Sequence, residues 1–349
     1  MKLLSRFFFG LFLLLFLMLS TFLVYLTHLR NEDMKLRQEP PLVHRSTSTS
    51  PRAMQIIHQG QVSSDAEGTR GILDQLTIEK DLLERRETKD NVCSKYGLDQ
   101  RGTDQLHQVY PWEYLISKEH SLVWCNVFKS GSSSWMYVFN QLAGHSTKFL
   151  NKKKQRPPMT IARDFYPRPS KEELIEAMNN SLSFIVARHP LERLVSGFRD
   201  KILGAVKGTH HDKMGKAINR KYGRSHTKKP SFSDFVTFVL ATFKETGVID
   251  MHWSPAFSFC NVCQMNFTMI VKFETFERDQ AYLLQKAGLQ GVVQTLKINA
   301  AQDGQNSQTV MNKYMEQLPL ELLEEICDFY KYDFQIFGYS YPKCDFFDK

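Results

Sequence analysis

A loop of small residues stands between two segments of different periodicity near residue 130. Ser121–Phe128 (SLVWCNVF) is β-branched and aromatic, which predicts a buried strand. Trp135–Gly144 (WMYVFNQLAG) repeats apolar residues on one helical face and ends on glycine, which predicts a helix. The intervening KSGSSS, Lys129–Ser134, offers backbone N–H groups, hydroxyls, a helix N-terminus and one mobile cation. This combination favours binding of a phosphate or sulfate; an ordinary strand–helix turn with a surface lysine is the alternative.

The position of the lysine argues against one class of phosphate loop. A Walker A loop carries Gly-Lys-Ser/Thr at its end, whereas Lys129 comes first here. An ATPase or kinase of the P-loop type is therefore disfavoured.

A second strand–loop–helix unit places an arginine where its strand ends. Ser183–Ala187 predicts a strand, Pro190 suits the first turn of a helix, and LERLVSGFRDKI continues with one apolar stripe. Arg188 at the strand end can fork onto a phosphate, and Ser196, eight residues later, can donate to the same oxygens. Taken alone, the unit has a simpler interpretation, in which Arg188 pairs with Glu192 and Ser196 is an ordinary helix residue.

Together the two units resemble the Golgi carbohydrate sulfotransferase family, and within it the chondroitin/dermatan 4-O-sulfotransferase group. K-S-G-S-S-S-W, Lys129–Trp135, is similar to the family's loop for the 5′-phosphosulfate of PAPS (3′-phosphoadenosine-5′-phosphosulfate). R-H-P-L-E-R-L-V-S-G-F-R-D-K, Arg188–Lys201, is similar to its 3′-phosphate site. Three later segments agree: D-M-H-W-S-P…C-N-V-C (Asp250–Cys263), I-V-K-F-E-T-F-E-R-D (Ile270–Asp279) and Y-D-F-Q-I-F-G-Y (Tyr332–Tyr339). The resemblance covers about Cys93 to Tyr339.

The chain departs from the family pattern at three places. Phe128 stands where a proline usually precedes the lysine, and His189 stands where an aspartate is common. Ser132–Ser134 replace a stretch in which a cysteine and an asparagine are frequent. The backbone of the loop survives these changes, whereas substrate preference need not follow the best-known members.

The resemblance implies an α/β fold with a P-loop-kinase-like central parallel sheet flanked by helices, and the alternating strand and helix signals agree. It implies transfer of a sulfuryl group from PAPS to a sugar hydroxyl of a glycosaminoglycan or related glycan, with PAP as product and no metal. Catalysis of this kind consists of positioning and charge stabilisation, with Lys129 neutralising the leaving group. The implied cofactor-binding residues are Lys129, Ser130, Gly131, Ser132, Ser133, Ser134, Trp135, Arg188 and Ser196.

A general base must take the proton of the acceptor hydroxyl. We choose His252, since an unperturbed imidazole titrates near pH 6.5, close to the pH of the Golgi lumen. The alternative is a histidine packed beside Trp253 without a catalytic role. Glu274, at a predicted strand end, is the second candidate, with a structural salt bridge as its simpler interpretation. His210 and His211 are interpreted as loop residues.

The charge of the chain points to an anionic partner. Lys and Arg number 45 against 37 for Asp and Glu, which gives a net charge of +8 over 349 residues. Lys201–Lys229 holds nine basic residues, four glycines and one acid, which predicts a flexible basic flap for an acidic glycan such as chondroitin; a solvated loop is the alternative. A second basic patch comprises Lys152, Lys153, Lys154 and Arg156. Nucleic acid is disfavoured, because no aromatic-interleaved binding motif appears.

The N-terminus predicts a membrane anchor. Phe7–Leu26 is a run of 20 uncharged residues, enough to span about 30 Å of hydrocarbon, and it continues past the only small polar residues near its end, Ser20 and Thr21. Residues 1–6 are then a cytoplasmic tail, and the protein is a single-pass type II protein of the Golgi membrane with a lumenal catalytic domain. A cleaved signal peptide is the alternative. Residues 27–90 are predicted as a lumenal stem with one weak helix at Ile72–Glu87, and residues 91–349 as the sulfotransferase domain. A homodimer formed through the stem helix is a minority alternative.

Six cysteines are too few for a small disulfide scaffold, and Cys260-x-x-Cys263 lacks a second pair at zinc spacing. An oxidising lumen favours structural disulfides, whose connectivity the sequence does not specify. Asn179 and Asn266 begin glycosylation sequons.

Two other functions stay open beside the enzyme. The altered loop is compatible with a catalytically weak, sulfotransferase-like glycan-binding protein. A lumenal nucleotide-dependent kinase is the third alternative.

Overall fold

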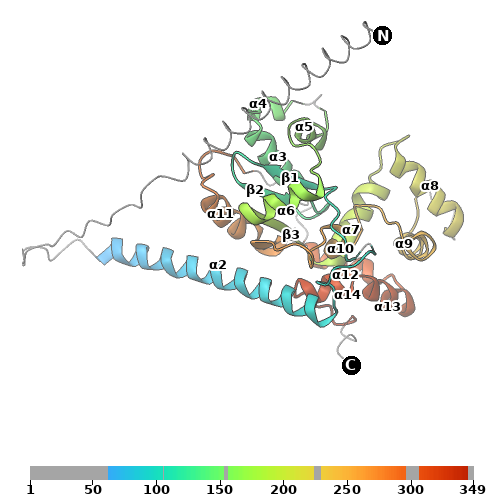
Figure 1. Ribbon diagram of the computed structural model, residues 1–349. Helices are drawn as coiled ribbons and strands as arrows, with labels where there is room; N and C mark the ends of the chain where they lie inside the picture. Colours follow the sequence, from blue (N-terminus) through green and yellow to red (C-terminus); the bar gives the residue numbers. More distant parts are fainter. Residues whose placement is uncertain (1–61, 105, 153–155, 224–228, 296–305, 345–349) are drawn as a thin grey trace, which may run out of the picture. The chain divides into compact units, whose positions relative to one another are not determined.

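The computed structural model describes residues 62–104, 106–152, 156–223, 229–295 and 306–344 (Figure 1). The predicted cytoplasmic tail, the membrane anchor at residues 7–26 and the first part of the stem lie outside them. Among the helices in these described ranges, none combines the length and the apolar character needed to cross a membrane.

A four-stranded sheet, in the order β1-β2-β3-β4, forms the centre of the described part of the chain. The strands are β1 (Tyr114–Ser117), β2 (Leu122–Cys125), β3 (Leu182–Ala187) and β4 (Met269–Lys272). β2, β3 and β4 are parallel, as predicted. The sheet is not parallel throughout, because the edge strand β1, which was not predicted, runs antiparallel to β2. Only four residues join these two strands, too few for the crossover that a parallel pair requires.

Helices cover both faces of the sheet, as predicted. Side chains alternate along a strand, so Trp124 and Phe184 pack into one apolar cluster while Val123 and Ile185 pack into another. The helices that contribute to the first cluster include α3 (Ser132–Leu142), α5 (Pro158–Phe165) and α11 (Phe276–Lys286). Those that contribute to the second include α6 (Lys171–Asn180), α10 (Ala256–Phe259) and α14 (Lys331–Ile336).

A third apolar cluster lies mainly among helices between β3 and α14 in the sequence. It is built around buried aromatic residues, including Phe198, Phe235 and Trp253. Its elements are α7 (Pro190–Gly197), the π-helix η1 (Phe198–Leu203), α8 (His210–Tyr222), α9 (Phe232–Thr246), α12 (Ser307–Met315) and α13 (Leu320–Phe329). The short elements α4 (Thr147–Leu150) and η2 (Phe273–Thr275) complete the described fold.

The segment predicted as a flexible flap contains a regular helix, α8. The Thr209 side chain caps its start by accepting from the Asp212 backbone N–H, and Ile218 on its inner face is fully buried. The basic residues of the segment therefore sit on a helix, and the prediction of a flexible loop is wrong for residues 210–222.

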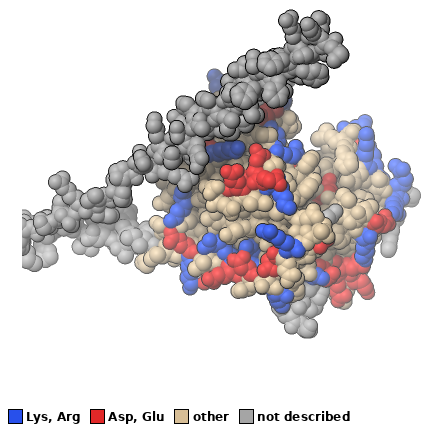
Figure 2. All heavy atoms as spheres, in the orientation of Figure 1, with Lys and Arg blue, Asp and Glu red and all other residues tan. Residues whose placement is uncertain are grey.

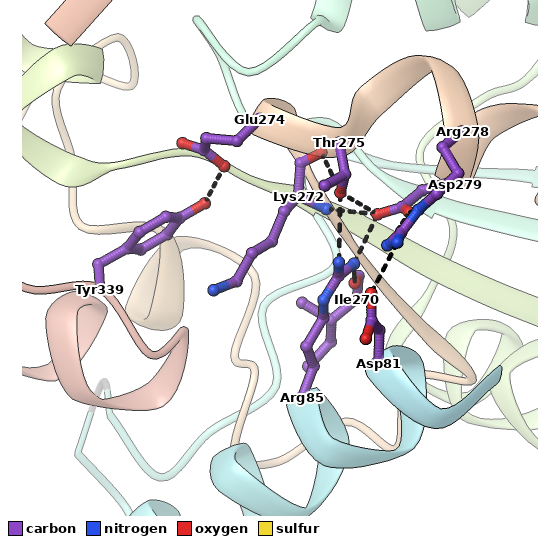
Figure 3. A network of polar contacts seen from close by, with 9 residues as sticks. All are labelled: Asp81, Arg85, Ile270, Lys272, Glu274, Thr275, Arg278, Asp279 and Tyr339. Carbon is purple, nitrogen blue, oxygen red and sulfur yellow. Dashed lines mark hydrogen bonds and ion pairs between the residues drawn. The ribbon is translucent and has the colours of Figure 1, made fainter. Parts of the chain in front are cut away.

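The helix predicted at Ile72–Glu87 is longer, and it belongs to the folded unit. α2 (Val62–Lys95) packs Leu82, which is 5% exposed, into the first apolar cluster. Arg85 donates to the Asp279 carboxylate at 2.5 Å and to the Ile270 carbonyl at 2.9 Å, and Asp81 pairs with Arg278 (Figure 3). These contacts tie α2 to β4 and α11.

The predicted disulfides are confirmed, and their connectivity is now defined. The pairs are Cys93–Cys263, Cys125–Cys260 and Cys327–Cys344. The two cysteines of the C-x-x-C motif join different partners, so the motif is neither a redox pair nor half of a zinc site. Cys125–Cys260 ties the end of β2 to the end of α10, close in sequence to His252.

Candidate active site

The loop between β2 and α3 has a strained and tightly packed backbone. Lys129 adopts φ 68° and Gly131 adopts φ 76°, both in the left-handed region. This conformation costs a non-glycine residue about 1–3 kcal/mol and is concentrated at functional sites. A Cβ at Gly131 would lie 2.9 Å from Cε2 of Phe276 on α11, so only glycine fits. The loop therefore has one fixed shape.

In this loop, Trp135 packs on the sheet, whereas Ser130 and the start of α3 carry polar groups that suit a ligand. Trp135 is fully buried, with its ring centroid 4.3 Å from that of Phe184, and so anchors α3 on the sheet. The N–H groups of Ser134 and Trp135 both donate to the Gly131 carbonyl. Ser132 begins α3, where backbone N–H groups have no partner within the helix. The Ser130 hydroxyl is buried and has no hydrogen-bond partner among the described residues, which fits a site for a ligand oxygen.

Lys129 is held by an acid that the sequence did not single out. Its Nζ lies 2.9 Å from Oδ2 of Asp200 on the π-helix η1, and Lys201 contacts the same oxygen at 3.2 Å. Burial lowers the pKa of Lys129, although Asp200 opposes the shift. π-helical turns are frequent at functional sites, and this one carries the residue that orients the lysine.

Arg188 joins the two strand–loop–helix units. Its Nη1 donates to the Lys129 carbonyl at 2.9 Å and its Nη2 to the Ser307 hydroxyl at 2.6 Å. Burial lowers its pKa, while Glu192, whose carboxylate lies 3.4 Å from Nε, opposes the shift. Arg188 therefore pairs with Glu192 and at the same time lies beside the loop of Lys129. Ser196 lies half-buried farther along α7.

His252 belongs to a cluster of two imidazoles and one carboxylate. Oδ1 of Asp250 accepts from Nδ1 of His252 at 2.7 Å and from its backbone N–H at 2.9 Å. Oδ2 of Asp250 accepts from Nε2 of His211 at 3.2 Å. Burial acts to raise the pKa of Asp250, but the hydrogen bonds from His252 outweigh it and lower the pKa to about 2. Asp250 is therefore a carboxylate at any physiological pH.

The cluster lies beside the loop. The His252 ring centroid is 4.8 Å from that of Phe128, the residue before Lys129. A Cβ at Gly197, next to Ser196, would lie 3.2 Å from the His252 carbonyl, so the end of α7 touches the same segment. The structure thus brings His252 to both units that carry the predicted phosphate sites.

The orientation of His252 suits proton transfer. A neutral imidazole that donates through Nδ1 leaves Nε2 to accept a proton. The ligand atoms of His211, Asp250 and His252 also lie within 4.8 Å of one another, so among the described residues this group could hold a metal ion. His211 was interpreted as a loop residue; it lies in the first turn of α8 and meets Asp250 across 39 residues of sequence, a separation that no local motif reveals.

Glu274, the second candidate base, is engaged elsewhere. Its Oε2 accepts from the Tyr339 hydroxyl at 2.8 Å (Figure 3), and its Oε1 accepts from the His189 backbone N–H at 3.2 Å. These contacts join the end of β4 to the start of α7 and to the C-terminal segment. They favour the structural interpretation of this residue.

The predicted basic surfaces are placed in part. On α8 the exposed cations are Lys213, Lys216, Arg220 and Lys221, and Figure 2 shows basic side chains along this helix. Of the second patch, Lys152 is exposed, Arg156 pairs with Asp164, and Lys153 and Lys154 lie outside the described residues. Both sequon asparagines, Asn179 and Asn266, are exposed.

Comparisons with known proteins agree with the two motifs. A model of the sulfotransferase family matches residues 112–340, more than half of the chain. Carbohydrate sulfotransferase 9 of Homo sapiens is 28% identical over 276 residues, which cover 74% of this chain and 60% of that protein. Carbohydrate sulfotransferase 8 of Homo sapiens is 25% identical (82% and 70% covered), and carbohydrate sulfotransferase 11 of Mus musculus is 24% identical (65% and 67% covered). No solved structure matches the chain significantly.

Proposed function

The chain belongs to the sulfotransferase family, and we propose that it is a carbohydrate sulfotransferase that moves a sulfuryl group from PAPS to a hydroxyl of an acidic glycan, of the chondroitin or dermatan type. The observation that carries the proposal is the meeting of three segments. Arg188 bonds the carbonyl of Lys129, and His252 lies against Phe128. A donor site and a proton acceptor are thereby side by side.

The proposed roles follow from these contacts. Arg188 and Ser196 bind the 3′-phosphate, and the loop from Ser130 to Ser134 binds the phosphosulfate. Lys129 exchanges Asp200 for the bridging oxygen as the sulfur–oxygen bond to the nucleotide breaks, and it neutralises the charge left on PAP. Nε2 of His252 takes the acceptor's proton as the acceptor oxygen bonds to sulfur. Asp250 stabilises the imidazolium that results.

The proposal places this reaction in the Golgi lumen, with residues 7–26 as a type II anchor. The uncharged run at these positions supports it. Carbonate extraction should leave the full-length chain in the membrane, and protease should not reach its C-terminus in sealed vesicles. Release by carbonate or digestion in sealed vesicles would contradict the topology.

The activity is tested by incubating the full-length chain in detergent with PAPS labelled in its sulfur, together with a panel of glycosaminoglycans. Disaccharide analysis of the labelled product then identifies the acceptor and the hydroxyl. We expect labelled glycan with wild type and less of it with Lys129→Ala. Glycan binding without transfer at any acceptor would favour a catalytically weak binding protein instead.

A further inference from the structure

Two exposed aromatic residues precede β1 at the end of the sheet where the candidate active site lies. β1 is antiparallel to β2, with Tyr114 opposite Cys125, and the Asn126 N–H continues the pairing by donating to the Glu113 carbonyl at 3.0 Å. The start of β1 therefore lies where β2 ends and the loop of Lys129 follows. Tyr110 and Trp112 stand just before this start.

The rings of Tyr110 and Trp112 are nearly parallel, and both are exposed to solvent. Tyr110 is 58% exposed and Trp112 is 43% exposed. Their planes differ by 14° and their centroids lie 6.2 Å apart. This separation exceeds the contact distance of about 3.5–4 Å for carbon atoms, so the rings are offset and part of each face is left uncovered by the other. An exposed aromatic surface of this kind can stack against the C–H groups of a sugar ring.

The side chain of Arg168 lies on the Trp112 ring and forms an ion pair with Glu113. The Arg168 guanidinium lies 3.9 Å from the Trp112 ring centroid, and Arg168 remains 39% exposed. It also pairs at 3.4 Å with Glu113, a buried carboxylate that accepts from the Asn126 side chain at 3.1 Å. Glu113 therefore contacts both Arg168, which lies on Trp112, and Asn126, which follows β2 and precedes the loop of Lys129.

We propose that Tyr110, Trp112 and Arg168 form an acceptor subsite for an acidic sugar. The exposed parts of the two rings contact the C–H groups of a sugar unit, and Arg168, which lies on the Trp112 ring, pairs with the carboxylate or sulfate group of that sugar. The inference rests on the proposed function for the identity of the ligand as the acceptor. It assigns recognition of sugar shape to this surface, in addition to the attraction of polyanions by α8.

The test is equilibrium binding of fluorescent chondroitin, dermatan sulfate and heparan sulfate to the full-length chain in detergent, with PAP binding measured by calorimetry on the same preparation. Trp112→Ala should weaken binding of at least one of these glycans about 5- to 30-fold, as loss of an aromatic anchor does at interfaces. Trp112→Phe should retain most of the affinity. Arg168→Gln should weaken binding and reduce its dependence on salt. Phe243→Ala, which removes an exposed aromatic residue of α9 that packs on Phe329 of α13, is the matched control and should change nothing.

The outcomes separate this proposal from the proposed function. Equal glycan affinity in wild type and Trp112→Ala would overturn the subsite, as would failure of wild type to bind any of the three glycans. Failure to bind PAP, together with glycan binding that depends on Trp112, would overturn the enzyme and leave the subsite. Unchanged PAP affinity in Trp112→Ala confirms that a loss of glycan binding does not come from unfolding.

Discussion

The donor half and the acceptor half of the candidate site are built in different ways. The donor half consists of a left-handed loop at Lys129 and Gly131 and a half-buried arginine, each at the end of a parallel strand. The acceptor half is assembled through side chains from separate segments, with His211, Asp250 and Trp112 on three of them. A site formed by backbone groups tolerates changes of side chain such as those at Ser132–Ser134. In a site formed by side chains, substitutions can instead change which substrate is bound.

The largest effect we expect comes from the acceptor half. His252→Ala should lower turnover by roughly 10²–10⁴, the usual contribution of a general base, while PAP affinity stays near that of wild type. Lys129→Ala should lower turnover and also change PAP binding, because this residue belongs to the donor loop. Turnover and PAP titration of the two variants on matched preparations check the separation.

Two controls test whether His252 is the base or only a packed side chain. Asp250→Asn keeps the shape of the cluster but weakens the grip on His252, and should lower turnover by about 10- to 100-fold, as loss of an orienting partner does. A packing role for His252 predicts instead a lower melting temperature with loss of all functions together. A stable His252→Ala protein with near wild-type turnover would rule it out as the base.

The next effect concerns the donor half. Arg188→Ala should weaken PAP binding by roughly 1.5–3 kcal/mol, about 10- to 150-fold, because a charge-assisted contact to phosphate is lost. Ser196→Ala removes only a neutral donor and should cost less. Calorimetry with PAP measures both. Unchanged PAP affinity in a folded Arg188→Ala protein would leave Arg188 as the structural partner of Glu192 and Lys129.

The same contrast explains what could be predicted from the sequence. The strands β2 and β3 and the donor segments were recognisable as local patterns of periodicity and small residues, whereas β4 and the helices on both faces were expected from the family resemblance. The edge strand β1 was not predicted, and its length does not explain this, since β2 and β4 are also four residues long. Asp200, His211 and the pairing of the cysteines depend on contacts between distant segments, which single-sequence patterns do not encode. The helix α8 was hidden by the glycines and lysines in and around it, although Thr209 and Asp212 form a recognisable cap.

A smaller effect is expected in the pH dependence of stability. Burial lowers the pKa of His211, although Asp250 opposes the shift. The unfolded chain therefore binds more protons than the folded one at pH values between the lower folded pKa of His211 and the unfolded pKa of about 6.5. This contribution to stability is fully present above that pH and is lost as pH falls through the lower folded pKa. Asp250, with a pKa of about 2, stays ionised over this range.

Chemical denaturation of wild type and His211→Gln at pH 7.5 and pH 5.0 isolates this contribution. Other histidines, such as His189, whose pKa burial also lowers, contribute equally to both proteins. Wild type should lose more stability than the variant between the two pH values. An identical loss in both would mean that His211 is not held in its neutral form by the fold.

The smallest effect, none at all, is expected from chelation. Asp250 already accepts three hydrogen bonds, two from His252 and one from His211, and a metal ion would have to displace those from both imidazoles. An ion bound there would also remove His252 as a proton acceptor. EDTA should therefore leave turnover unchanged, and added Zn²⁺ should inhibit wild type while inhibiting His211→Gln less, since that variant lacks one of the three ligands. Loss of turnover in EDTA that Zn²⁺ restores would show that the cluster of His211, Asp250 and His252 is a metal centre and not a proton-transfer group. The donor half would then still be formed by the backbone, but the acceptor half would be formed by a bound ion as well as by side chains.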